Sequence, residues 1–145
     1  MDNEVLIKKI IKCAQDVRKQ LPAGLEESVY RNALLIEFKE NGIDAETDVL
    51  KNIIYKNTIV GEVQVDILAA NSIIVEIEAV KHMPQEHEKQ LRNILKATDT
   101  EHGLLINFGG EKLEIKRKDK TPKEGKDIYY TYVLVPDDKT IGFKF

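Results

Sequence analysis

Acidic side chains interrupt two apolar stretches near the middle of the chain, at a spacing that could serve chemistry. Residues 61–80 read GEVQVDILAANSIIVEIEAV, which predicts two strands joined by a turn at residues 70–72. Because side chains two apart in a strand share a face, Gln64 lies with Asp66, and Glu76 with Glu78. A three-residue turn places Asp66 opposite Glu76 and Gln64 opposite Glu78. A two-residue turn would place the two sets on opposite faces.

Two interpretations of the Asp66 and Glu76 carboxylates follow from this pattern. Carboxylate oxygens on neighbouring strands are the ligands that Mg²⁺ prefers, and their burial is costly unless a cation compensates. Alternatively, the acids lie on the solvated face of an antiparallel sheet and have no chemical role. The local pattern does not decide between them, so the choice depends on the rest of the chain.

Composition restricts the class of protein. The 145 residues fit a single domain, which we divide into a core at about 3–117 and a C-terminal extension at 118–145. The net charge of −3 gives no global basic field, but residues 112–126 carry seven Lys/Arg against three acids. That segment is either a phosphate-facing patch or a solvated charged loop. The single cysteine, Cys13, lies in an apolar helical pattern and fits a reducing compartment. With no membrane-length apolar run, we expect a cytoplasmic protein that does not bind membranes. A homodimer is left open.

The hydrophobic periodicity predicts an α/β fold with a mixed central sheet flanked by helices. Strand, helix and strand in succession imply a right-handed crossover that places residues 104–108 parallel to 72–80. The predicted helices span about 3–20, 26–40 and 84–98, and the predicted strands about 49–55, 59–69, 72–80, 104–108, 112–116 and 128–135.

Several blocks together resemble a known family. The stretch from Gly24 to Tyr30, GLEESVY, matches the pattern Gly-x-x-Glu-x-x-Tyr of the GxxExxY proteins. Later blocks match in order from about Ile7 to Arg117: Gly61-Glu62, Val65-Asp66-Ile67, Val75-Glu76-Ile77, Gln90-Leu91-x-Asn93 and residues 103–109. That family is similar to the PD-(D/E)xK nuclease superfamily. The resemblance implies a restriction-endonuclease-like core (αβββαβ), here with extra C-terminal strands.

The resemblance also implies roles for individual residues. Asp66 and Glu76 correspond to the acids that bind Mg²⁺ or Mn²⁺, and Glu27 is a candidate third carboxylate. The metal activates water and stabilises charge on phosphorus, with DNA or RNA as the substrate. Gln90 corresponds to the helix motif of these nucleases, and Gly24 and Tyr30 complete the family pattern.

Two departures from the superfamily affect the expected activity. The position of the lysine that orients the attacking water is occupied by Glu78. The helix motif Gln-x-x-x-Tyr is incomplete, because Ile94 follows Gln90 four residues later. We therefore expect a nuclease-like protein that binds nucleic acid with weakened or lost catalysis. The alternative is an active Mg²⁺-dependent nuclease in which Lys81 or Lys51 has taken the lysine's role. A purely structural protein that interacts through its tail is a third hypothesis.

Two further expectations concern the surroundings of the acids. Carboxyls that converge without a metal cannot all stay charged cheaply, so at least one should have a raised pKa, and Glu78 is our first choice. Of the three histidines, only His87, one helical turn before Gln90, is expected to face the site.

Overall fold

The computed structural model describes residues 1–135 and 139–144 and confirms the α/β fold class. Its helices are α1 (Asn3–Gln20), α2 (Glu27–Glu40) and α3 (Gln85–Ala97), with a short 3₁₀ turn at Lys123–Gly125. Its strands are β1 (Ala45–Tyr55), β2 (Thr58–Ala69), β3 (Ile73–Glu78), β4 (His102–Asn107), β5 (Leu113–Asp119), β6 (Ile128–Val135) and β7 (Lys139–Lys144). Strand β7 was not among the predicted strands, and β1 begins four residues before its predicted start at residue 49.

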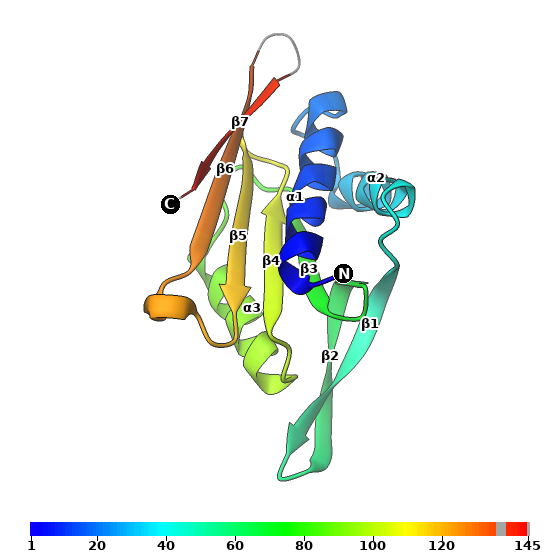
Figure 1. The fold of residues 1–145 in the computed structure, drawn as a ribbon, viewed down its shortest axis with the longest axis vertical. Helices are drawn as coiled ribbons and strands as arrows, with labels where there is room; N and C mark the ends of the chain where they lie inside the picture. The colour runs from blue at the N-terminus through cyan, green and yellow to red at the C-terminus, as the bar shows by residue number, and fades with distance from the viewer. Residues whose placement is uncertain (136–138, 145) are drawn as a thin grey trace.

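The seven strands form one mixed sheet in sequential order from β1 to β7. Only β3 and β4 pair in parallel among the described strands, and α3 makes the predicted crossover between them. In Figure 1, α1 lies in front of the sheet and α3 behind it. The C-terminal strands β5, β6 and β7 extend the sheet by antiparallel pairing on the side away from β1.

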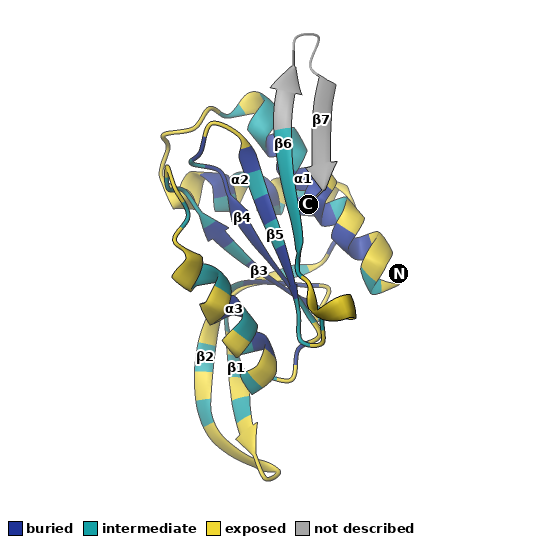
Figure 2. Ribbon diagram, turned by 90° about the vertical axis from the view of Figure 1, so that its left-hand side faces the viewer, coloured by how far each residue is buried: buried dark blue, intermediate teal, exposed yellow. Residues whose placement is uncertain are grey.

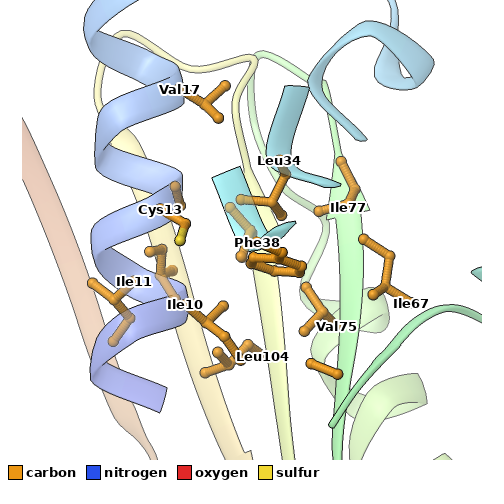
Figure 3. Packing of buried hydrophobic residues seen from close by; sticks show 14 of the residues in the cluster. Ile10, Ile11, Cys13, Val17, Leu34, Phe38, Ile67, Val75, Ile77 and Leu104 are labelled. Carbon is orange, nitrogen blue, oxygen red and sulfur yellow. The ribbon is translucent and has the colours of Figure 1, made fainter. Parts of the chain in front are cut away.

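The sheet separates two hydrophobic clusters. The larger cluster fills the space between the sheet and helices α1 and α2, where Ile10, Leu34 and Phe38 meet Val75 and other strand residues (Figure 3). The smaller cluster lies under α3, whose Leu91 and Leu95 pack on Ile74 and Leu105. Both helix faces follow from the apolar spacing read in the sequence.

Helix α1 matches its predicted bounds because local signals mark both its packing face and its start. The side chain of Asp2 accepts a hydrogen bond from the Val5 N–H at 2.9 Å, which satisfies one of the free donors of the first turn. Cys13 is buried on the apolar face, and burial raises the pKa of its thiol to about 11. Cys13 is therefore a core residue, as its place in the apolar helical pattern predicted.

The regular alternation of side chains between the two faces of the sheet is interrupted in β2 at Asp66. Val65 packs in the cluster under α3, whereas Ile67 packs in the cluster under α1 and α2. Two residues apart on a regular strand would share a face, so the uninterrupted alternation that the sequence suggested for β2 is wrong here. In the β1–β2 register Asp48 stands across from Asp66, and its φ of 52° is left-handed. This irregularity accompanies the change of face.

The β1–β2 hairpin projects beyond the body of the sheet (Figure 2). Its turn has two residues, Lys56 and Asn57, both with positive φ, which matches the twist of the flanking strands. The register shifts between Ile53 and Ile54 through a bulge. Large apolar side chains of the hairpin are exposed: Leu50, Ile54, Tyr55, Ile59 and Val60.

Candidate functional site

The candidate site lies where β2 and β3 separate. Their backbone pairs show a three-residue turn at residues 70–72, the first of the two alternatives, and the same register continued by one residue brings Asp66 across from Glu76. At this point the Oδ2 atom of Asp66 accepts a hydrogen bond from the Ile77 N–H, at 2.9 Å. The carboxylate therefore takes a backbone donor of β3 and is held in one orientation. The observed pairs are Ile67–Val75, Leu68–Ile74 and Ala69–Ile73.

Glu76 is the most perturbed acid of this region. Its Oε1 atom is buried and has no hydrogen-bond partner among the described residues. Burial, followed by the charge of the neighbouring Asp66, raises the pKa of Glu76 to about 9. The expectation that one carboxyl of this site has a raised pKa is thus confirmed. The residue is Glu76, and the choice of Glu78 from the sequence was wrong. An orphaned buried carboxylate oxygen is a feature that a bound cation would satisfy.

A cavity of about 100 Å³, which we call the acid cavity, is lined by residues of β3 and α3. Glu76 and Glu78 reach it from alternate positions of β3, and His87 and Gln90 reach it from positions three apart on α3. The Nδ1 atom of His87 lies 2.8 Å from Oε1 of Glu78, at ion-pair distance but without hydrogen-bond angles. The prediction that His87 faces the site is confirmed. The other lining residues are Val63, Gln64, Leu91, Ile94 and Leu105.

Glu27 approaches from the first turn of α2. Burial raises the pKa of its carboxyl, as do the charges of Asp66 and Glu78, while Arg31 lowers it. Glu27 is therefore within electrostatic range of the two strand acids. Its position at a helix N-terminus favours a negative charge.

The remaining pattern residues shape the loop before α2. Gly24 has a φ of +97°, a left-handed conformation that glycine adopts without strain. The Tyr30 hydroxyl donates to the Pro22 carbonyl oxygen at 2.5 Å and accepts from the Leu25 N–H at 3.1 Å. Its buried ring stacks on Phe108, with centroids 4.9 Å apart. Gly24 and Tyr30 thus fix the loop that presents Glu27.

Sequence reasoning missed two residues at the edge of the site, Arg31 and Asp48. Arg31 Nη1 lies 3.4 Å from Asp48 Oδ1, which also accepts a hydrogen bond from Gln64 Nε2 at 3.2 Å. Arg31 follows Glu27 by four residues, so helical spacing alone could have placed it beside that acid. Nothing in the sequence marked Asp48, because its role depends on the left-handed backbone opposite Asp66.

The cavity contains no lysine among its described lining residues. Lys51 pairs across the hairpin with Val63, and Lys81 is exposed after the end of β3. The basic side chain nearest to Glu78 in this cavity is His87. The relocation of the lysine role to Lys51 or Lys81 stays a prediction.

The donor set fits a hard cation in part. Asp66 and Glu76 provide only oxygen ligands, and the Oε1 of Glu76 is free to bind a cation because it has no hydrogen-bond partner among the described residues. Within the described residues, no group of three or more Asp, Glu, His or Cys side chains stands at metal-binding distance. Since Mg²⁺ is often held by one or two carboxylates together with water and phosphate oxygens, the Asp66–Glu76 pair alone suits it.

The comparison with known families agrees with this architecture. The family model of the PD-(D/E)XK nuclease superfamily matches residues 4–118, and the chain therefore belongs to this superfamily. No curated protein and no solved structure matched the chain. Among the described residues no helix is long and apolar enough to cross a membrane. Neither the fold nor the family match supports the homodimer considered above.

Proposed function

We propose that this protein binds nucleic acid through a divalent-metal site on its nuclease fold and cleaves the bound strand poorly. The observation that carries the proposal is the buried Oε1 of Glu76, which lacks a partner and lies beside a second carboxylate, Asp66. Such an arrangement is costly unless a cation binds, and superfamily membership makes a nucleic acid the natural ligand of that cation.

Each acid has a distinct role in the proposal. Asp66, oriented by the Ile77 N–H, and Glu76 would hold Mg²⁺ or Mn²⁺. Glu27 would act as a third carboxylate at longer range, and Gln90 would contact the substrate strand from α3. When bound, the metal supplies an activated water and stabilises charge on phosphorus. The finer assignment to the GxxExxY proteins rests on the Gly24, Glu27 and Tyr30 pattern.

Poor cleavage is proposed because Glu78 occupies the position of the usual lysine. An anion there repels both the attacking hydroxide and the phosphate. At ~4 Å and an effective dielectric of ~20, one charge pair contributes about 4 kcal/mol, so a reversed sign opposes catalysis strongly. When protonated, His87 offsets part of this repulsion, because it lies 2.8 Å from the Glu78 carboxylate.

The same contact supports a second candidate, an active Mg²⁺-dependent nuclease. In that case the cation of the site comes from His87 on α3, or from Lys81 or Lys51 as the sequence suggested. His87→Gln would then remove most of the cleavage, whereas in the first candidate there is little cleavage to lose.

Cleavage of labelled single- and double-stranded DNA and RNA with Mg²⁺ or Mn²⁺ tests the proposal. The unmodified protein should bind the nucleic acid but cleave it poorly. Glu78→Lys should raise the cleavage rate at least tenfold, and Asp66→Ala in that background should abolish the gain. Glu40→Lys, an exposed site at the end of α2, makes the same charge change away from the cavity and should have no effect. Efficient cleavage by the unmodified chain, unaffected by Glu78→Lys, would favour the second candidate.

A further inference from the structure

A second depression adjoins the acid cavity. An open groove of about 360 Å³ runs between the β1–β2 hairpin and α3. Apolar side chains form much of its surface, namely Ile53 and Val63 from the hairpin and Ile94 and Ala97 from α3. Figure 2 shows the projecting hairpin beside α3, the two elements that supply the residues lining the groove. Neither a metal nor a phosphate would be attracted by such a surface.

The groove continues directly into the acid cavity. Val63, Gln90 and Ile94 line both. Of the two proposed metal ligands, Glu76 lines this cavity and Asp66 lies beside Glu76. A phosphate held by their metal would therefore have its neighbouring nucleotide next to the mouth of the groove. The cavity itself, at about 100 Å³, is too small for a nucleotide, so the groove is the adjoining space in which a base fits.

The polar groups of the groove suit an uncharged heteroaromatic ring. Gln90 and Asn93 are three residues apart on α3, and both side chains are exposed on the same helix face. Carboxamides offer donors and acceptors together, which is the pattern that reads base edges. Glu86 and Lys89, which also line the groove, have opposite charges, so the groove has no strong preference for an ion.

We propose that this groove binds one unpaired nucleobase that flanks the phosphate at the metal site. The inference rests on the proposed function, because it requires the strand to enter at Asp66 and Glu76. A base in a duplex has its edge paired and its faces stacked, so only a single-stranded or unstacked nucleotide reaches the apolar floor. The protein should therefore prefer single-stranded ends or loops to continuous duplex.

Fluorescence anisotropy with a short single-stranded oligonucleotide in Ca²⁺ buffer tests this site. In a series of oligonucleotides, each with one abasic position, one position should weaken binding by about tenfold, because the missing base loses its apolar contacts and its edge hydrogen bonds in the groove. Asn93→Ala should reduce the difference between the intact and that abasic oligonucleotide. Asn52→Ala removes an exposed carboxamide of β1 outside the groove and should leave the difference unchanged.

The outcomes separate this inference from the proposed function. If the oligonucleotides bind in an Asp66-dependent way but no abasic position weakens binding, the base site is wrong and the metal-site proposal stands. Tighter binding of continuous duplex would also overturn the base site. If neither the single-stranded oligonucleotides nor the duplex binds, both proposals fail.

Discussion

The two sides of helix α3 differ in how their charges are matched. On one side His87 and Gln90 face a cavity in which a buried oxygen of Glu76 has no partner. On the other side Glu88 accepts from Lys118 at 2.9 Å and from Lys116 at 2.5 Å. Lys118 also donates to Asp127 at 2.8 Å, and Arg92 pairs with the same carboxylate. We call Glu88, Arg92, Lys116, Lys118 and Asp127 the ionic network.

The pKa values reflect this difference. Burial acts to raise the pKa of Glu88, but hydrogen bonds from Lys116 and Lys118 bring it below the ordinary value. Burial also raises the pKa of Glu76, and because no cation lowers it again, the pKa rises to about 9. Helix α3 therefore borders both an acid whose charge is balanced by lysines, Glu88, and an acid that has no such partner, Glu76. The compensated network ties α3 to β5 and the start of β6, and the uncompensated acid marks the site.

Four of the seven cations at residues 112–126 pair with carboxylates of the protein. Lys116 and Lys118 belong to the ionic network, Arg117 pairs with Glu4 and Asp119, and Lys120 pairs with Asp99. These cations are occupied by protein carboxylates, so this part of the segment is not a free phosphate-facing patch.

Breaking the ionic network should have the largest effect on stability. Lys118→Met removes a nearly buried cation, 7% exposed, and leaves Glu88 and Asp127 short of a partner. Loss of one partner from a buried ion pair costs several kcal/mol, and the partial exposure of both acids reduces the expected loss to about 2–3 kcal/mol. Urea denaturation measures it.

Lys120→Met is the matched control, because Lys120 pairs with Asp99, whose carboxylate is largely exposed. It should leave the midpoint unchanged. Equal effects of the two substitutions would show that the network does not contribute more than a surface pair.

Replacing the ionisable carboxyl of Glu76 should change stability in the opposite direction. The folded-state pKa of Glu76, about 9, lies above its ordinary value of 4.5, so the folded protein binds the extra proton between these pH values. Stability from this group is therefore complete below about pH 4.5 and falls as pH rises towards 9. Glu76→Gln should stabilise the metal-free protein by about 2 kcal/mol at pH 8 and by little at pH 4.5. Urea denaturation in EDTA at the two pH values measures the effect, and a destabilised variant at pH 8 would contradict it.

A divalent metal should stabilise the site and not the network. At ten times the dissociation constant, a ligand that binds only the folded state adds about 1.4 kcal/mol. Thermal melts with Mn²⁺ and with EDTA should differ accordingly in the unmodified protein and in Lys118→Met. Asp66→Ala should lose the difference. A metal response that survives this substitution would place the metal elsewhere.

The smallest effect is expected at the Glu4–Arg117 pair, which joins α1 to β5. The hydrogen bond from Arg117 lowers the pKa of Glu4 to about 2. Its contribution is therefore complete above about pH 4.5 and is lost as pH falls through 2. Because Glu4 is 60% exposed, water screens the pair, and Glu4→Gln should cost less than about 1 kcal/mol at pH 7. The difference from the unmodified protein, followed by urea denaturation, should narrow towards pH 2 and in high salt.

Local signals in the sequence determined much of the fold. The apolar period gave the bounds of α1, and it placed β2 and β3 on either side of a turn at residues 70–72, although the length of that turn was decided only by the structure. The spacing along β3 and α3 placed Glu76, Glu78, His87 and Gln90 where they meet in one cavity. These features depend on periods of two and 3.6 residues, which any stretch of chain carries within itself.

Only the tertiary structure decided which charges are matched. The change of face at Asp66 accompanies the left-handed backbone of Asp48 on the neighbouring strand, and the pairing of Lys116 and Lys118 with Glu88 depends on how α3 lies across β5. Likewise Glu76, and not Glu78, has the orphaned oxygen, because burial is set by the neighbours that pack around each acid. Burial and ion pairing join residues far apart in the chain, so the energy of each charge is a property of the packed molecule.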